Sequence, residues 1–434
     1  MKIPLTLSAL CLLSGYTMAA MPVYLPVGSS YTLGGVVNPR ALSTSLANPA
    51  APYAMASTSA GKSWRAGFLG PVGVAYEVGK VDDFTDRVDD LEDILGKTDY
   101  ASIAEANAAL DDANSILNDL SESAYVKLSG STQVPFMPII YKTRTRGAFM
   151  LDASASFVGK ANILSDDISV TGSGSNYQLD SNSSLYLASA TDVRVGLGYS
   201  QMLARTPVGE LIGGVKANFH RISLGRSLAV LSDESDDTEE VFIDSISDDK
   251  KASSGVGIDL GAIWVSHQYQ LGVTLANINQ PTFEFDDLGD CSGLSGSSLA
   301  SCDAANELAS DGKLSLSERY KMEAQTTVDG AITSRNRQWI LAASYDVNAV
   351  KDPVGDDYQW GVVSLAYFSD SVLAPGVRVG YRENFAGSKL SYVTAGLTFF
   401  RRLNVDLAYG LEKIEGDSVL PRSMALSVGY DMAF

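Results

Sequence analysis

The residue types that carry most enzyme chemistry are scarce in this chain. It has two histidines, His220 and His267, and a hydrolase acting on lipids would need one of them paired with a serine and an orienting group. Ser266 precedes His267, but neighbouring residues of a strand point to opposite faces. Alternation places His220 on one face with Lys216 and Asn218, as a polar residue that lines an interior. We therefore predict no catalytic residues and no enzyme activity.

Charged side chains at alternate positions of strand-like segments are the other candidates for a functional site. By their spacing they share one inner face: Arg194, Lys216, Arg378 and Arg382 with Asp259, Asp406 and Asp431. We predict that these residues and His220 line a lumen. A salt-bridged interior that holds a plug explains them, and the alternative is a selectivity filter for anionic head groups.

The N-terminus has the features of a secretory signal peptide. Lys2 gives a short positive start, residues 3–13 are apolar, and Ala19 and Ala20 offer a cleavage site, so we assign residues 1–20 to a signal. No later run reaches the roughly 18 to 20 apolar residues of a membrane-spanning helix. The mature chain is therefore a soluble exported protein or a β-barrel whose lipid-facing residues alternate with inner ones.

Two cysteines remain beyond the signal, Cys291 and Cys302, eleven positions apart in a Gly/Ser-rich stretch. An exported protein meets oxidising conditions, so we predict a loop disulfide; the alternative is two thiols that never pair. With so few histidines and cysteines we predict no metal site and no cofactor. The net charge of −19 argues against a nucleic-acid partner, whose phosphates would be repelled.

Alternation of apolar with small or polar residues favours the barrel. In one segment Val377, Val379 and Tyr381 fall on one face, while Gly376, Arg378, Gly380 and Arg382 fall on the other. The chain ends on alternating apolar residues, Val428, Tyr430, Met432 and Phe434, which resembles the C-terminal signal of bacterial outer-membrane barrels. We therefore expect the outer membrane of a Gram-negative bacterium, with membrane lipid and the barrel-assembly machinery as partners.

Fifteen segments show a strand pattern, and we expect about fourteen strands because bacterial barrels usually close with an even number. The segments are 65–78, 135–143, 148–160, 184–202, 208–225, 238–247, 253–265, 267–279, 320–332, 339–348, 358–368, 374–383, 389–400, 403–411 and 422–434. The predicted fold is an all-β transmembrane antiparallel barrel over residues 61–434.

Three segments do not fit the barrel pattern. Apolar residues at three- and four-residue intervals predict a helical hairpin within 81–122, with an acidic face. Residues 21–60 are rich in Gly, Ser, Ala and Pro, and they form either a disordered leader or a plug in the lumen. The cysteine-containing stretch 283–317 is expected to be a long external loop.

The order of several short motifs resembles a known family. The run over residues 34–50, with Asn38, Pro39, Asn48, Pro49 and Ala50, is similar to the N-terminal hatch of FadL-type long-chain fatty-acid transporters. The chain is more similar to the conjugal-transfer TraF-like outer-membrane proteins, which carry an acidic helical insertion after the first strand. This resemblance implies a closed, plugged barrel.

We expect a plugged channel for hydrophobic or amphipathic small molecules, with an apolar pocket between hatch and wall. The alternative is a structural or docking component of a conjugation-type cell-surface apparatus. A hydrolase that depends on His220 is the third and weakest hypothesis.

Overall fold

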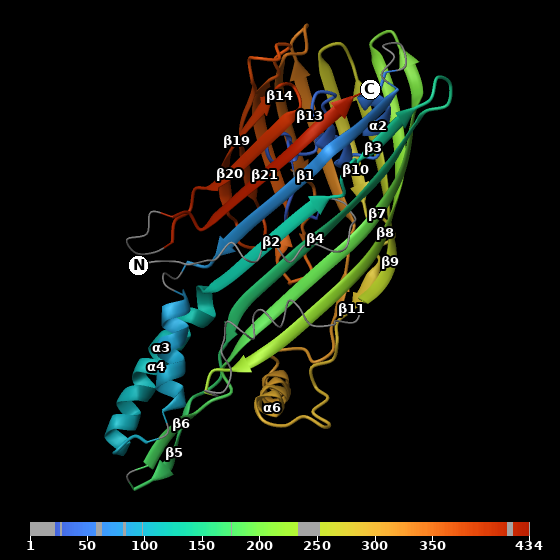
Figure 1. The fold of residues 1–434 in the computed structure, drawn as a ribbon. Coiled ribbons are helices and arrows are strands. Elements are labelled where there is room, and N and C mark those ends of the chain that lie inside the picture. Colours follow the sequence, from blue (N-terminus) through green and yellow to red (C-terminus); the bar gives the residue numbers. More distant parts are fainter. Residues whose placement is uncertain are drawn as a thin grey trace.

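The protein is a closed antiparallel β-barrel of fourteen wall positions, as predicted (Figure 1). The computed structural model describes residues 22–26, 28–57, 63–80, 84–97, 99–174, 176–232, 252–414 and 420–433. The wall strands are β1 (Trp64–Val78), β2 (Tyr125–Gln133), β3 (Ile139–Lys142), β4 (Ala148–Leu164), β7 (Ser184–Thr206), β8 (Gly209–Val230), β9 (Ala252–Val265), β10 (Tyr269–Ala276), β13 (Gln325–Thr333), β14 (Trp339–Asp346), β17 (Trp360–Tyr367), β18 (Gly376–Asn384), β19 (Ser391–Phe399), β20 (Leu403–Gly410) and β21 (Ser423–Ala433). Strands β2 and β3 share one position, since both pair with β1 and β4, and β1 pairs with β21 to close the ring.

Burial along the strands shows which face meets lipid. In β18 the apolar Val377, Val379 and Tyr381 are 41–50% exposed, whereas Arg378 and Arg382 are at most 2% exposed. A soluble sandwich would show the reverse, with its apolar face buried. An apolar outer surface around a polar interior is the arrangement of a transmembrane barrel, so this chain is an outer-membrane protein.

Aromatic side chains mark one rim of this apolar band. They pair across neighbouring strands at the end where the N-terminal part of β1 lies: Trp64 with Tyr141, Phe149 with Tyr199, and Trp339 with Tyr367. Aromatic girdles of this kind sit at the membrane interface in barrels. At this end β7 and β8 are joined by only two residues, and the long connections all lie at the opposite end. Short turns face the periplasm in bacterial barrels, so the long connections are extracellular.

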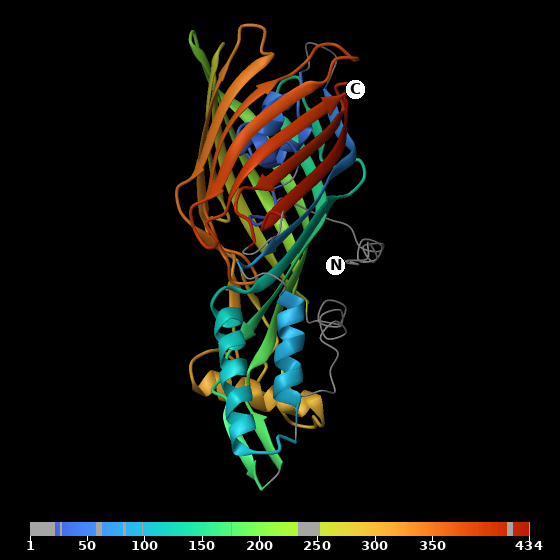
Figure 2. The same cartoon turned by 90° about the vertical axis from the view of Figure 1, so that its left-hand side faces the viewer.

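The extracellular connections fold into a structure that we call the head. It contains α3 (Phe84–Gly96), α4 (Ile103–Ser123), the hairpin of β5 (Ser169–Ser173) and β6 (Asn176–Asp180), and α6 (Ser297–Ser310) (Figures 1 and 2). The side chain of Ser102 caps α4 by accepting from the backbone N–H of Glu105. Leu91, Leu117 and Leu120 pack on the extended ends of β4, β7 and β8, so the head has its own apolar core. No helix among these described residues is long and apolar enough to cross a membrane.

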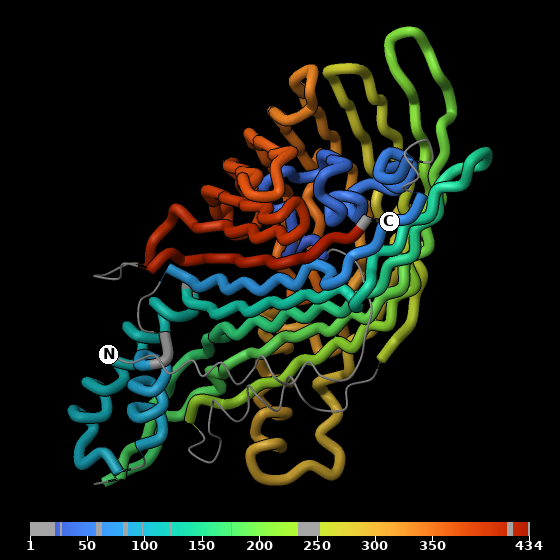
Figure 3. The backbone as a smooth tube through the Cα atoms, turned by 45° about the horizontal axis from the view of Figure 1, so that its top comes forward, coloured from blue at the N-terminus to red at the C-terminus, as the bar shows by residue number. Residues whose placement is uncertain are grey.

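The N-terminal residues 22–57 lie inside the barrel, and we call them the hatch (Figure 3). The hatch contains α1 (Ser30–Leu33), the 3-10 helix η2 (Leu42–Leu46) and α2 (Ala51–Met55). Its apolar side chains enter three clusters with inward-facing wall residues: Leu42 and Met55 with Ile140 and Ile263, Leu33 and Val36 with Ala342 and Ala366, and Leu25 and Tyr31 with Tyr392. The expected plug in the lumen is therefore present.

Several segment boundaries differ from the prediction. The pattern at 135–143 covers only β3, and the longer β2 before it was missed. The stretch 283–317 contains α6, and the segment 320–332 divides into the short β12 (Arg319–Lys321), which pairs with β11 (Thr282–Glu284), and the wall strand β13. Residues 1–20, the segment 238–247 and Phe434 lie outside the described residues.

Candidate functional site in the barrel interior

Two wall glycines give the hatch backbone room to approach the barrel. A Cβ at Gly214 of β8 would collide with the backbone of Pro49 and Ala50, and one at Gly261 of β9 would collide with Asn48. Asn48 itself accepts from the N–H of Ala50 at 2.9 Å, and its amide donates to a carbonyl of β10 at 3.1 Å. The predicted hatch residues Asn48, Pro49 and Ala50 thus touch the wall directly.

Carboxylates of the wall bind the other half of the hatch. Asp406 accepts from the Thr32 hydroxyl at 3.4 Å, and Asp431 accepts from the backbone N–H of Leu42 at 2.9 Å. Asp406 also receives a bidentate set of bonds from Arg378, at 3.0 and 3.1 Å, with both side chains fully buried. Of the predicted hatch residues Asn38 and Pro39, the side chain of Asn38 caps a turn within the hatch, and the Pro39 carbonyl accepts from Arg65 of the wall strand β1.

Most of the remaining predicted lumen residues take part in contacts with carboxylates of the barrel wall. Lys216 pairs with Asp152 at 2.8 Å, and Asp259 accepts from Asn218 at 2.6 Å. Arg194 borders a cavity described below. Cys291 and Cys302, far from the lumen, form a disulfide that joins α6 to the chain before it.

His220 lies in the interior without a nucleophile. Its Nδ1 is 2.9 Å from Asp192, and its buried Nε2 faces Gly257 of β9 with no hydrogen-bond partner. Ser156, a lumen serine, lies on β4, which is on the opposite side of β8 from β9, and accepts from Tyr24 of the hatch. Among the described residues, no serine hydroxyl is hydrogen-bonded to this imidazole. Within the described parts of the chain, no group of three or more His, Cys, Asp or Glu could hold a metal ion.

A second closure lies at the extracellular end of the lumen. Residues 347–359, between β14 and β17, fold inward as a hairpin of β15 (Val350–Lys351) and β16 (Asp357–Tyr358), which we call the strap. Asp352 stabilises the turn by accepting from the backbone N–H groups of Val354 at 3.0 Å and Asp356 at 2.9 Å. In the ring of fourteen positions, β14 is seven positions from β2, so the strap crosses the lumen to reach the far wall.

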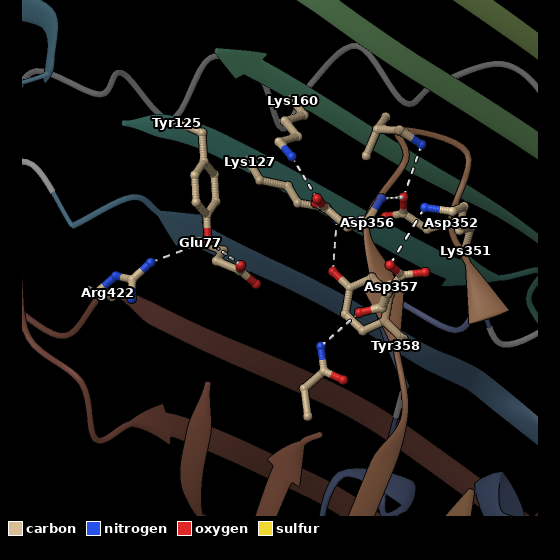
Figure 4. Close-up of polar contacts among 12 residues, drawn as sticks. Glu77, Tyr125, Lys127, Lys160, Lys351, Asp352, Asp356, Asp357, Tyr358 and Arg422 are labelled. Carbon is tan, nitrogen blue, oxygen red and sulfur yellow. Dashed lines mark hydrogen bonds and ion pairs between the residues drawn. The ribbon is translucent and has the colours of Figure 1, made fainter. Parts of the chain in front are cut away.

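Two lysines of the far wall hold the strap, in a group that we call the latch (Figure 4). Lys127 of β2 lies 2.6 Å from Asp352, 2.6 Å from Asp356 and 2.8 Å from the Tyr358 hydroxyl. Lys160 of β4 lies 2.6 Å from the other oxygen of Asp356. Two ammonium groups therefore balance two carboxylates.

The position of each carboxylate determines its titration. Burial raises the pKa of Asp352, which is fully enclosed. Burial would also raise the pKa of Asp356, but the ammonium groups of Lys127 and Lys160 outweigh it and lower that pKa. Beside the latch, Tyr125 donates to Glu77 at 2.5 Å and receives a bond from Arg422 at 3.4 Å.

Hatch and strap together bound a cavity of about 220 Å³. Ser30, Gly34 and Pro49 of the hatch line one side of it, and Val350 and Pro353 of the strap line the other. The wall around it carries the charged residues Asp192, Arg194, Asp259, Asp346 and Arg382 beside Trp360 and Val362. The lining of this cavity is mixed, because the strands that enclose it turn their polar face inward.

The strap and the latch were not found from the sequence. Asp352-Pro-Val-Gly-Asp356 has turn-forming residues between two strands, which predicts a loop but not its direction. Lys127 lies in the strand that alternation missed, and its partner is 225 positions away. A lysine at an inward position of a wall strand was the one available signal.

A closed antiparallel barrel with an apolar outer surface, an internal hatch and an inward-folded strap defines a plugged outer-membrane barrel. The sequence matches the family described as "F plasmid transfer operon, TraF, protein" over residues 45–346. This match covers more than half of the 434 residues, and the chain belongs to that family.

Solved structures of several outer-membrane proteins are similar at low identity. A Pseudomonas aeruginosa FadL homologue is 12% identical, with a TM-score of 0.43, and the match covers 95% of this chain and 99% of that one. A mutant of the TodX monoaromatic hydrocarbon channel is 13% identical, with a TM-score of 0.44, covering 94% and 98%. The Escherichia coli outer membrane phospholipase A is 11% identical, with a TM-score of 0.25, covering 84% and 93%. No curated protein matches the sequence significantly.

Proposed function

We propose that this chain is a plugged channel that admits a small amphipathic molecule from outside into the cavity between strap and hatch. The observation that supports this most is the cavity itself, bounded by two closures of different chemistry and lined by both apolar and charged side chains. Ligand sites generally combine an apolar lining with a few placed polar groups. The chain acts in this proposal by binding and passage, without catalysis, on a hydrophobic or amphipathic small molecule.

In this proposal the strap is the outer gate. Its latch consists of ion pairs, and the desolvation of buried charges offsets much of their attraction. When the strap moves outward, Lys127, Asp352 and Asp356 regain water, so the closed position is favoured by only a small net free energy. Molecules enter when the strap is out, and the hatch prevents free passage into the periplasm.

The experiment is to purify the full chain from outer membranes and identify what remains bound. Native mass spectrometry of the detergent-free protein is expected to show a small organic molecule in substoichiometric or stoichiometric amount. Ala47→Leu, which enlarges a cavity-lining side chain of the hatch at an ordinary helical backbone conformation, should lose that molecule while the barrel stays folded. If the Ala47→Leu protein retains the same molecule, the cavity is not its site.

The structural or docking role is the second candidate, and the separate core of the head is the observation that favours it. The chain's family takes its description from a plasmid transfer operon, which is the setting where such a partner would be sought. Replacing residues 81–122 by a short linker should leave the barrel folded and small-molecule binding intact. If that deletion removes only the association with other envelope proteins, the docking role stands beside the channel.

In either role we propose outer-membrane lipid and the barrel-assembly machinery as partners, and no nucleic acid.

A further inference from the structure

Arg382 of β18 is a buried cation with two donor atoms that have no hydrogen-bond partner among the described residues. Its side chain is 2% exposed, and its Nε and Nη1 have no hydrogen-bond acceptor. Arg378, four residues earlier on the same inner face, has Asp406 and Thr398 as acceptors. Asp346 lies nearby, but its oxygens are occupied by donors that include Thr327 at 2.6 Å, and it forms no ion pair with Arg382 among the described residues.

Aromatic rings surround this guanidinium. The guanidinium carbon lies 3.9 Å from the ring centroid of Trp360 and 5.6 Å from that of Tyr31. Trp360 is also in contact with Tyr358 of the strap and with Tyr392, at centroid distances of 5.6 and 6.0 Å. Both rings lie beside the guanidinium, and the N–H groups of its buried Nε and Nη1 have no acceptor. Such N–H groups form strong, charge-assisted hydrogen bonds with a carboxylate.

Leaving a buried charge unpaired is costly, so an anion is the complement that this guanidinium requires. Arg382 and Trp360 both line the cavity between hatch and strap, so a molecule bound there lies beside both side chains. The cavity has a volume of about 220 Å³. A cavity of about 150 Å³ accommodates benzene, whereas pockets for larger ligands span about 300–1,000 Å³. One aromatic ring with a carboxylate fits this volume, and a long acyl chain would extend beyond it.

We propose that Arg382 is the anion-binding residue of the cavity and that the ligand is a small aromatic carboxylate whose ring packs on Trp360. This inference rests on the proposed channel function and specifies its ligand class. The carboxylate accepts from the guanidinium through Nη1, and the strap closes over the ring through Tyr358.

Calorimetric titration of the full-length protein in detergent, in a buffer without carboxylates, tests the proposal with four probes. Benzoate is the expected ligand, benzyl alcohol removes the charge, hexanoate removes the ring, and laurate adds chain length. We expect benzoate to bind at least tenfold more tightly than benzyl alcohol, since a hydrogen-bonded charged group contributes about 1.5–3 kcal/mol. Hexanoate and laurate keep the carboxylate and should bind more weakly than benzoate because they lack the ring that packs on Trp360.

Variants assign the effect to the guanidinium. Arg382→Met should weaken benzoate at least tenfold and leave benzyl alcohol unchanged. Arg382→Lys should fall between, because an ammonium is a compact charge that does not stack on Trp360. Arg335→Met is the matched control: it removes an exposed arginine between β13 and β14 that does not line the cavity, and it should bind benzoate like the native protein. Heat-modifiable gel migration checks that each barrel is folded.

The outcomes separate the two proposals. If laurate or benzyl alcohol binds as tightly as benzoate, or Arg382→Met binds benzoate normally, the ligand class is overturned and the channel remains. If hexanoate equals benzoate, the aromatic part is overturned. If none of the four probes binds, the ligand class is overturned, and the native mass spectrometry described above decides the channel function separately.

Discussion

The lumen is closed at two places, and the two closures differ in how they are held. The hatch packs apolar side chains such as Leu33 and Leu42 into the wall, and glycines such as Gly214 let its backbone lie against the strands. The strap is held to the far wall by the ion pairs of Lys127 and Lys160, with Val354 as its apolar contact there. Apolar burial gives a large favourable free energy, whereas buried ion pairs give a small one. In the proposed channel, we therefore expect the hatch to remain in the lumen and the strap to be the closure that opens.

The largest expected effect comes from breaking the buried ion pair of Arg378 and Asp406, because the surrounding wall and hatch cannot move to expose the remaining charge to water. Asp406→Ala leaves Arg378 uncompensated behind the hatch and should lower the free energy of unfolding by about 3–5 kcal/mol. Urea unfolding followed by tryptophan fluorescence measures it. Asp370→Ala is the control, because Asp370 pairs with Arg40 of the hatch at an exposed site and should cost about 0–1 kcal/mol. Equal losses in the two variants would contradict the distinction.

Removing one charge from the latch should destabilise only the strap and not the whole barrel. Lys127→Met leaves Asp352 and Asp356 short of one ammonium group, but the strap can swing into water and hydrate them. Hydrogen exchange of residues 347–359 should accelerate, while the free energy of barrel unfolding changes by about 1 kcal/mol or less. Lys351→Met, which removes an exposed charge of the strap, should leave the exchange rates as they are. A global loss of stability in Lys127→Met would show that the strap is part of the barrel core.

A smaller effect is expected where the hatch backbone meets the wall. Gly214→Ala places a methyl group against Pro49 and Ala50 and should destabilise the hatch by about 1–3 kcal/mol. Increased protease cleavage within residues 28–57 reports it. Gly330→Ala has the side chain of Leu271 3.4 Å away as its nearest neighbour, and should be neutral. Cleavage of both variants at the native rate would mean that the hatch adapts without cost.

The smallest effect is expected at the edge of the latch. Lys160 is 19% exposed and pairs with Asp356, which keeps Lys127 as a partner when Lys160 is removed. Lys160→Met should therefore accelerate hydrogen exchange of residues 347–359 only by the factor that corresponds to about 1 kcal/mol or less. If Lys160→Met opens the strap more than Lys127→Met, the assignment of the central lysine is wrong.

Alternation predicted most of the wall because each strand buries one face and exposes the other. The method missed β2, since Lys127, Ser129 and Ser131 alternate there with weakly apolar neighbours directly after a helix. It also missed α6, where Ser and Ala dominate and the apolar period is short. Local patterns carry no information about such segments.

The interior was predicted only in part. Inner-face positions such as Lys216, Arg378 and Asp406 follow from the period of two, but their partners do not. Asp152, the partner of Lys216, is 64 positions away, and no spacing identifies it. The strap depends on contacts across the whole barrel, so only the folded structure shows that Asp352 and Asp356 turn inward.

Whether the strap controls access to the cavity can be measured directly with a cysteine placed behind it. Val362→Cys puts a thiol in the cavity wall, and a small membrane-impermeant thiol reagent reaches it from outside only when the strap is open. Adding Lys127→Met should raise the modification rate about tenfold or more, which corresponds to about 1.4 kcal/mol, while Lys351→Met should leave it unchanged. Equal rates with and without Lys127 would contradict the account, because the cavity would then be open by another route.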